Sequence, residues 1–257
     1  MTRTRCRLVL FFAGSLLATA LLSPPAAADD AAARGLMGQV FDLAKVSFEA
    51  RMKLSSPGGL VRELNVHHKQ MGTVSATYME ITAPFNLKDT RFLEWDREGG
   101  PDETYTYLPM LKRSVQVPAW TKQQSFLGSN FYMVDIAIPD MTAFDYTGLG
   151  TSEVEGVPCS LVESRPRRPE EEVYSKVIYC VDVEKLVSLR TEFYDEKGAL
   201  LKVWLAQKLE KVDGTWVPRV QIMTDVQQQT DSRLEIVEIV MPVDPADELF
   251  RKAHLDR

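Results

Sequence analysis

Alternation of apolar and polar residues is the feature that most constrains the fold of this chain. It begins with Val46, Phe48, Ala50 and Met52, whose neighbours are polar or charged, and it continues to the turn "SSPGG". A period of two gives a β-strand one apolar and one polar face, and short turns between such strands make antiparallel hairpins. The pattern returns in eleven to thirteen segments, so it predicts a mainly β protein whose antiparallel meander curls toward a barrel.

The N-terminus follows a different pattern, that of a secretory signal peptide. Three arginines precede an apolar stretch, Leu8 to Leu22, and small residues end it at Ala28. A retained membrane anchor is the alternative, but a spanning helix needs about 20 apolar residues. We predict a signal peptide at residues 1–28 and a single exported, periplasmic domain at residues 29–257. Directly after it, Leu36, Val40 and Leu43 have the spacing of one amphipathic helix.

The charge of the mature chain excludes one class of partner. Without residues 1–28 the chain has 27 Lys and Arg against 36 Asp and Glu, a formal charge near −9. A nucleic-acid-binding surface is usually basic, so no nucleic acid is expected as a partner. A chain of this length buries roughly 70% of its unfolded surface, enough for one core with an internal cavity.

Two cysteines remain in the mature chain, Cys159 and Cys180. An even pair in an exported protein favours a disulfide, with two buried thiols as the alternative. If the flanking segments form a hairpin in which Val162 pairs with Val177, the two cysteines lie directly opposite each other, at a distance that suits a disulfide.

Residues 118–142 interrupt the alternation. The segment contains two prolines, a glycine and the aromatic residues Trp120, Phe126, Phe131 and Tyr132. A long irregular insertion in a β-rich chain is usually a functional lid or a disordered loop, and so many aromatic side chains argue against disorder. We expect this segment to cover an apolar surface.

No catalytic or metal-binding constellation is evident. A nucleophile elbow requires a glycine on each side of the serine, but Phe131 stands where the second should follow Ser129. The histidines, His67, His68 and His254, lack the spacing of a metal site, and the two cysteines lack a zinc pattern. We therefore expect neither an enzyme nor a bound cofactor or metal.

A hairpin rich in aromatic residues precedes the irregular region. Its first arm places Leu93 and Trp95 on one face, and its second arm does the same with Tyr105 and Tyr107. Such residues often only fill a core. A curled sheet of about eleven strands, however, encloses more space than its side chains fill, which suits an apolar ligand.

Six stretches resemble a known family. They occur in the same order and are "FLEW", "YTYLPMLKRSVQV", "SFLGSNF", "RTEFYDEKGALLK", "VDGTWVPRVQIM" and "ELFRKAHLDR". Over residues 48–257 the chain resembles the LolA-like outer-membrane lipoprotein-sorting proteins, in particular the branch often associated with RND-type exporters. The family pattern is usually closer to G-S-D-F-T-Y-E-D, whereas here Asn130 and Val134 replace the two acids and only Asp135 remains.

The resemblance implies an incomplete, unclosed antiparallel barrel with a few helices over its concave face. Such proteins carry acyl chains of lipoproteins or other lipids through the periplasm, without a cofactor. By this analogy, Lys112 and Arg113 lie near the rim of a lipid-binding hollow, where they meet a partner or a head group. The hollow itself is then lined by Leu93, Trp95, Tyr105, Tyr107, Leu108, Trp120, Phe126 and Phe131.

Three functions remain for comparison. The first is a carrier or chaperone that binds lipid or lipoprotein acyl chains and moves them from an inner-membrane exporter toward an outer-membrane acceptor. The second is a non-catalytic accessory subunit that docks on an inner-membrane RND-type exporter. The third is a hydrolase that uses Ser129, for which the sequence offers no base.

Overall fold

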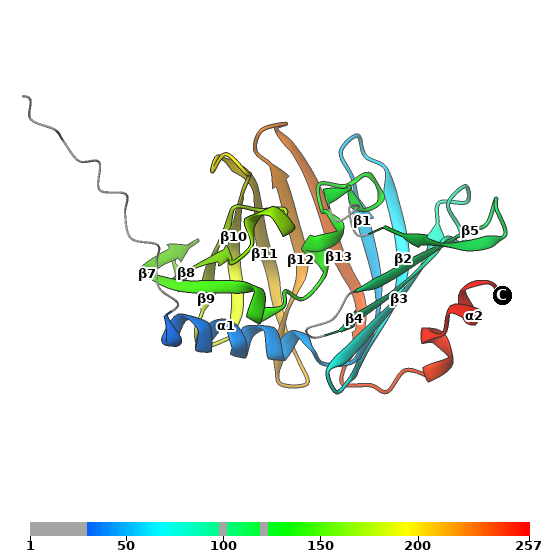
Figure 1. Ribbon diagram of the computed structural model, residues 1–257, viewed down its shortest axis with the longest axis horizontal. Coiled ribbons are helices and arrows are strands. Elements are labelled where there is room, and N and C mark those ends of the chain that lie inside the picture. Colours follow the sequence, from blue (N-terminus) through cyan, green and yellow to red (C-terminus); the bar gives the residue numbers. More distant parts are fainter. Residues whose placement is uncertain (1–29, 98–101, 119–122) are drawn as a thin grey trace, which may run out of the picture.

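One continuous antiparallel sheet forms the molecule in the computed structural model (Figure 1), which describes residues 30–97, 102–118 and 123–257. The predicted signal peptide lies outside the described residues. The sheet has 13 strands in the order β6-β5-β4-β3-β2-β1-β13-β12-β11-β10-β9-β8-β7. The strands are Phe48–Ser55 (β1), Val61–Met71 (β2), Val74–Ala83 (β3), Arg91–Arg97 (β4), Glu103–Leu108 (β5), Arg113–Val117 (β6), Phe144–Val154 (β7), Val157–Pro166 (β8), Lys176–Asp182 (β9), Val187–Tyr194 (β10), Leu200–Val212 (β11), Thr215–Asp225 (β12) and Thr230–Val240 (β13).

The sheet curves strongly but does not close. Strands β6 and β7 lie at its two edges, and each pairs with one neighbour only, β5 and β8 respectively. The predicted fold class, an unclosed and curled antiparallel sheet, is therefore confirmed, with 13 strands in place of about eleven.

Helices and 3-10 turns lie on both sides of the sheet. They are α1 (Ala31–Ala44), η2 (Phe126–Gly128), η3 (Met133–Ile136), η4 (Met141–Ala143), η5 (Pro169–Glu171), η6 (Asp247–Phe250) and α2 (Lys252–Leu255). We call the face that carries Leu64, Val66 and His68 of β2 the inner face, and the opposite one, which carries Tyr78 and Leu93, the outer face.

Helix α1 spans one end of the inner face (Figure 1). Its N-cap is Asp30, whose carboxylate accepts hydrogen bonds from the backbone N–H groups of Ala32 and Ala33 and so satisfies two otherwise free donors. Arg34 then donates to the carbonyl oxygens of Met141 (2.8 Å) and Phe144 (2.5 Å). These bonds fasten the helix to the end of the irregular region and to β7.

The C-terminal segment covers part of the outer face. Phe250 of η6 and Leu255 of α2 are buried against Tyr78 and Leu93, and Arg91 donates to the backbone oxygen of Leu255 (3.0 Å). Figure 1 shows α2 beside β4 and β5, away from α1. The last residues of the chain thus complete a second apolar cluster.

Cys159 and Cys180 form a disulfide, with Cα atoms 5.3 Å apart. They lie in the predicted hairpin, β8 and β9, but the predicted register is wrong. Val177 pairs with Ser164 and Cys180 with Leu161, so the disulfide joins diagonal neighbours. The loop between the strands contains η5, and the pairing is shifted by two residues from the expected one.

Candidate functional site

An apolar cavity of about 470 Å³ lies on the inner face. Its floor is the sheet, and its cover consists of α1 and of residues 123–143, which we call the insertion segment. This volume is in the range of ligand-binding pockets. Its apolar lining includes Val40, Phe41, Leu43, Phe48, Met52, Leu64, Val66, Met79, Phe126, Phe131, Ile136, Ile138, Trp204, Trp216, Leu234, Ile236, Ile239 and Met241.

The insertion segment begins with a compact loop. The backbone N–H of Phe126 donates to the carbonyl of Phe131 (2.7 Å), and Gly128 takes a positive φ of 70° that favours glycine. The buried hydroxyl of Ser129 donates to the carbonyl of Phe126 (2.6 Å) and accepts from the N–H of Phe131 (3.2 Å). The hydroxyl of Ser129 therefore stabilises the turn. The aromatic rings of Phe126 and Phe131, on either side of it, pack in the apolar cluster beneath.

Asn130 attaches this loop to β12 and β13. Its amide nitrogen donates to the carbonyls of Met223 (3.3 Å) and Thr230 (2.5 Å), while its backbone N–H donates to the hydroxyl of Ser232 (2.9 Å). An asparagine supplies both donors and acceptors, whereas an ionised aspartate only accepts. The departure from the family pattern thus suits the two carbonyl groups that this side chain meets.

A buried ion pair fastens the second half of the segment. The ammonium of Lys202, on β11, lies 3.1 Å from the carboxylate of Asp135, and both side chains are 0% exposed. The hydroxyl of Tyr174 donates to the other carboxylate oxygen (2.5 Å), and the ring centroid of Tyr132 lies 2.8 Å from the ammonium nitrogen. The one acid that remains from the family pattern is therefore part of this anchor.

Burial sets the protonation of this cluster. It lowers the pKa of Lys202 to about 8, against the attraction of Asp135, which raises it. Burial and the adjacent Asp135 carboxylate raise the pKa of Tyr174, which therefore stays a donor. At neutral pH the structure thus contains an ammonium, a carboxylate and a hydroxyl that satisfy one another.

Seven of the eight predicted lining residues lie in the described ranges, and two of these seven are at the cavity. Phe126 and Phe131 line it. Leu93, Trp95, Tyr105 and Tyr107 share one face, as predicted, but it is the outer face, where they pack with Phe250 and Leu255 of the C-terminal segment. Their assignment to the hollow is wrong, because the strand pattern shows which residues share a face but not which face is inner.

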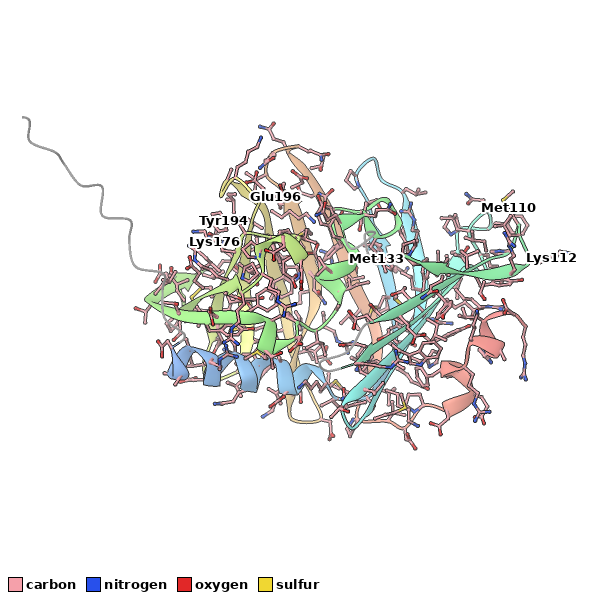
Figure 2. All side chains as sticks on the ribbon, viewed as in Figure 1. Met110, Lys112, Met133, Lys176, Tyr194 and Glu196 are labelled. Atoms are coloured by element: carbon pink, nitrogen blue, oxygen red, sulfur yellow. A yellow bond between two sulfur atoms is a disulfide. The ribbon has the colours of Figure 1, made fainter. Side chains whose placement is uncertain are left out.

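The other predicted residues lie elsewhere. Leu108 is half-buried at the end of β5 and does not line the cavity, and Trp120 lies outside the described residues. Lys112 and Arg113 are exposed at the turn from β5 to β6 and do not line the cavity, and their role at its rim stays a prediction. Figure 2 shows Lys112 and Met110 at the far tip of this hairpin.

The sequence matches the model of a known protein family. A family model described as an uncharacterized protein matches residues 74–257. The chain belongs to this family, and its fold is LolA-like. No curated protein matches the sequence.

Solved structures define the fold more closely. A domain described as that of an outer membrane lipoprotein-sorting protein, from Vibrio parahaemolyticus, has a TM-score of 0.81 and 21% identity over 88% of this chain and 99% of its own. A protein of a domain family of unknown function from Desulfovibrio piger has a TM-score of 0.81 and 24% identity over 87% and 98%. A LolA superfamily protein from Nitrosomonas europaea has a TM-score of 0.68 and 17% identity over 86% and 98%. At these identities the likeness establishes the fold.

Several residues of the LolA-like cavity and its cover were not predicted from the sequence. Lys202 stands in an apolar row with Leu200 and Trp204, and a lysine in such a row is a signal for a buried partner. His68 is buried on the inner face, 6% exposed, and burial lowers its pKa to about 4. Neither residue carries a motif that identifies it.

Neither a metal-binding group nor a membrane-spanning helix is present in the described ranges. Residues 30–97, 102–118 and 123–257 contain no group of three His, Cys, Asp or Glu that could hold a metal ion. In the same ranges no helix is both long and apolar enough to cross a membrane.

Proposed function

We propose that this protein is an exported carrier that binds the hydrocarbon chain of a lipid or lipoprotein in the inner-face cavity and moves it toward the outer membrane. The observation that carries the proposal is the apolar cavity, partly open to solvent, between the sheet, α1 and the insertion segment. Burial of hydrocarbon contributes roughly 25 cal/mol per Å². The likeness in fold to a lipoprotein-sorting domain supports the same conclusion.

The proposal gives the covering elements distinct roles. Helix α1 contributes Val40, Phe41 and Leu43 to the lining, and the insertion segment contributes Phe126 and Phe131. The polar anchors at Asn130 and Asp135 hold the insertion segment at a fixed place on the sheet. The apolar rings of the segment then form a lid over the bound chain.

Binding of the neutral fluorescent probe N-phenyl-1-naphthylamine tests the carrier function. Val40 lines the cavity, whereas its neighbour Gln39 on α1 is exposed. We expect the wild type to bind the probe, Val40→Trp to bind it about tenfold more weakly or worse because the indole fills the cavity, and Gln39→Trp to match the wild type. Mass spectrometry of extracts from the periplasmic protein should detect an acyl ligand. Absence of both probe binding and a copurified ligand would refute the carrier function.

A second candidate, docking on an inner-membrane exporter, is favoured by one observation. Phe85 and Met110 are 95% and 96% exposed, in the turns β3–β4 and β5–β6. These turns lie at the same end of the sheet, because Arg91 pairs with Tyr107. The exposed cations Lys88 and Lys112 lie in the same two turns. Exposed apolar side chains of this size are typical of contact sites.

A further inference from the structure

Among the described residues two cations are buried, Arg62 and Lys202, and only Lys202 has a counterion, Asp135. Arg62 lies near the start of β2, is 7% exposed, and forms no ion pair with any Asp or Glu of residues 30–97, 102–118 and 123–257. Burial lowers the pKa of its guanidinium, but an arginine stays charged at neutral pH. A buried charge without a counterion is destabilising, so the folded protein would gain stability from an anion placed beside Arg62.

The hydrogen bonds of Arg62 leave one edge of its guanidinium free. Nη1 donates to the hydroxyl of Ser56, at 2.8 Å. Nε is buried and has no partner among the described residues, and Nη2 forms no hydrogen bond to them either. Nε and Nη2 share the edge of the planar group that carboxylates and phosphates bind with two parallel hydrogen bonds. The free edge therefore has the donor geometry of an oxyanion site.

Gly128 of the insertion segment leaves the guanidinium close to the surface. Gly128 is exposed, and a Cβ atom built on it would lie 3.4 Å from Nη2 of Arg62. A side chain at this position would therefore cover the guanidinium. The hydroxyl of Ser56, which begins the β1–β2 turn, lies 3.5 Å from the carbonyl of Leu127, so the turn and the insertion segment meet at Arg62. An anion that approaches beside Gly128 thus meets Nη2 first.

We propose that Arg62 is the cationic centre of a binding site for an oxyanion, a carboxylate or a phosphate. The anion bonds to the free edge of the guanidinium beside Gly128 and supplies the missing counterion. A free phosphate ion and the head group of an anionic lipid share this chemistry. Arg62 precedes Leu64, a lining residue of the cavity, on the same face of β2, so a lipid held here by its head group lies at one end of the cavity. The site goes beyond the proposed carrier function, which rests on the apolar cavity alone.

Inorganic phosphate and octyl phosphate are the probes that test this site. Phosphorus NMR titration of the wild type should give a dissociation constant below about 10 mM for at least one of them. At ten times that constant, the anion should raise the folding equilibrium constant about elevenfold in urea titrations, relative to sodium chloride of equal ionic strength. Arg62→Met should lose this gain, because it removes the charge. Lys53→Met, which removes an exposed cation paired with Glu63, is the matched control and should keep it.

The comparison between variants separates the site from general effects of phosphate, which stabilises most proteins through exclusion from their surface and acts on all three proteins alike. An affinity for octyl phosphate within about tenfold of that for inorganic phosphate indicates a free anion as the ligand, and a larger preference indicates a lipid head group. Equal gains in the wild type and in Arg62→Met would overturn the proposal.

A second measurement decides if Arg62→Met does not fold. Dissociation constants above about 10 mM for both anions in the NMR titration of the wild type also overturn the proposal. Arg62 does not line the cavity, so folded Arg62→Met should bind N-phenyl-1-naphthylamine as the wild type does. Failure of the oxyanion site is thereby distinguished from failure of the carrier function, in which the wild type itself does not bind the probe.

Discussion

Removal of the Asp135 carboxylate is the sharpest test of how the insertion segment is held. The carboxylate is the counterion of Lys202, and neither side chain is exposed. In Asp135→Asn the ammonium keeps the hydroxyl of Tyr174 (3.1 Å) and the ring of Tyr132, but it loses the opposite charge. A buried charge without its counterion is strongly destabilising.

Two independent considerations give the expected loss in the free energy of unfolding. Breaking a buried ion pair by removing one partner costs about 3–5 kcal/mol. Lys202 can also escape by releasing its proton, and at pH 7 this costs at most about 5 kcal/mol, since the ordinary pKa of 10.5 lies 3.5 above that pH. We therefore expect Asp135→Asn to lower the free energy of unfolding by about 3–5 kcal/mol at pH 7.

Urea denaturation of the mature protein, followed by tryptophan fluorescence, measures this loss. Lys202→Met added to Asp135→Asn removes the stranded charge and should recover most of the stability, whereas Glu196→Gln, at an exposed carboxylate, should be silent. The deficit of Asp135→Asn should shrink as pH rises toward about 8. Asp135 raises the pKa of Lys202, so its loss puts the folded pKa of the variant below the wild-type value of about 8; the folded variant then releases the proton and recovers stability at a lower pH than the wild type, and above pH 8 both gain stability in parallel. A loss below about 1 kcal/mol, or no rescue by the double substitution, would refute the reasoning.

Two further predictions concern His68 and the exposed turns. Burial lowers the pKa of His68 to about 4, so as pH falls from 6.5 the unfolded state binds the proton before the folded state does. By pH 4 the free energy of unfolding of the wild type should therefore fall by about 3 kcal/mol more than that of His68→Gln, as measured by urea titration at each pH. Parallel pH profiles of the two proteins would contradict this. For the exposed turns, a photoreactive residue at position 111 should crosslink to an inner-membrane exporter. Phe85→Ser combined with Met110→Ser should abolish this crosslink and leave probe binding unchanged. Val226→Ser, at another exposed site, should change neither. Equal crosslinking in both variants would exclude docking through these turns.

The strand pattern predicts which residues of a strand share a face, but it does not fix the register of every hairpin or show which face is the inner one. Leu93 pairs with Tyr105, as the alternation in this hairpin requires. The opposite face of β4 carries Glu94 and Asp96, and charged residues ordinarily mark the solvent side. Here that side faces the cavity, and the apolar side is covered by a segment near residue 250, far away in the sequence. No local pattern contains this information.

The anchors of the insertion segment were unpredictable for a different reason. Asn130 and Asp135 lie in a segment without periodicity, and their partners are on β11, β12 and β13. The aromatic residues of the segment predict that it covers an apolar surface. They do not indicate where it attaches, since hydrogen bonds and ion pairs between residues far apart in the sequence follow no fixed spacing.

The anchors also bear on how tightly this protein should hold a ligand. Arg34 fastens α1, and the Asp135–Lys202 pair fastens the insertion segment, so the cavity is formed before a ligand enters. A preformed site avoids the free-energy cost of ordering loops on binding. More of the free energy from apolar burial therefore contributes to the affinity for the ligand. A carrier must also release its cargo, and release requires that at least one part of the cover moves. The buried ion pair costs several kcal/mol to break. Helix α1 is held by hydrogen bonds from Arg34 to half-buried carbonyl groups and by the packing of Ala33 and Met37, while its later residues Val40 and Leu43 lie over the cavity. We therefore expect the ligand to leave past α1, with the insertion segment in place.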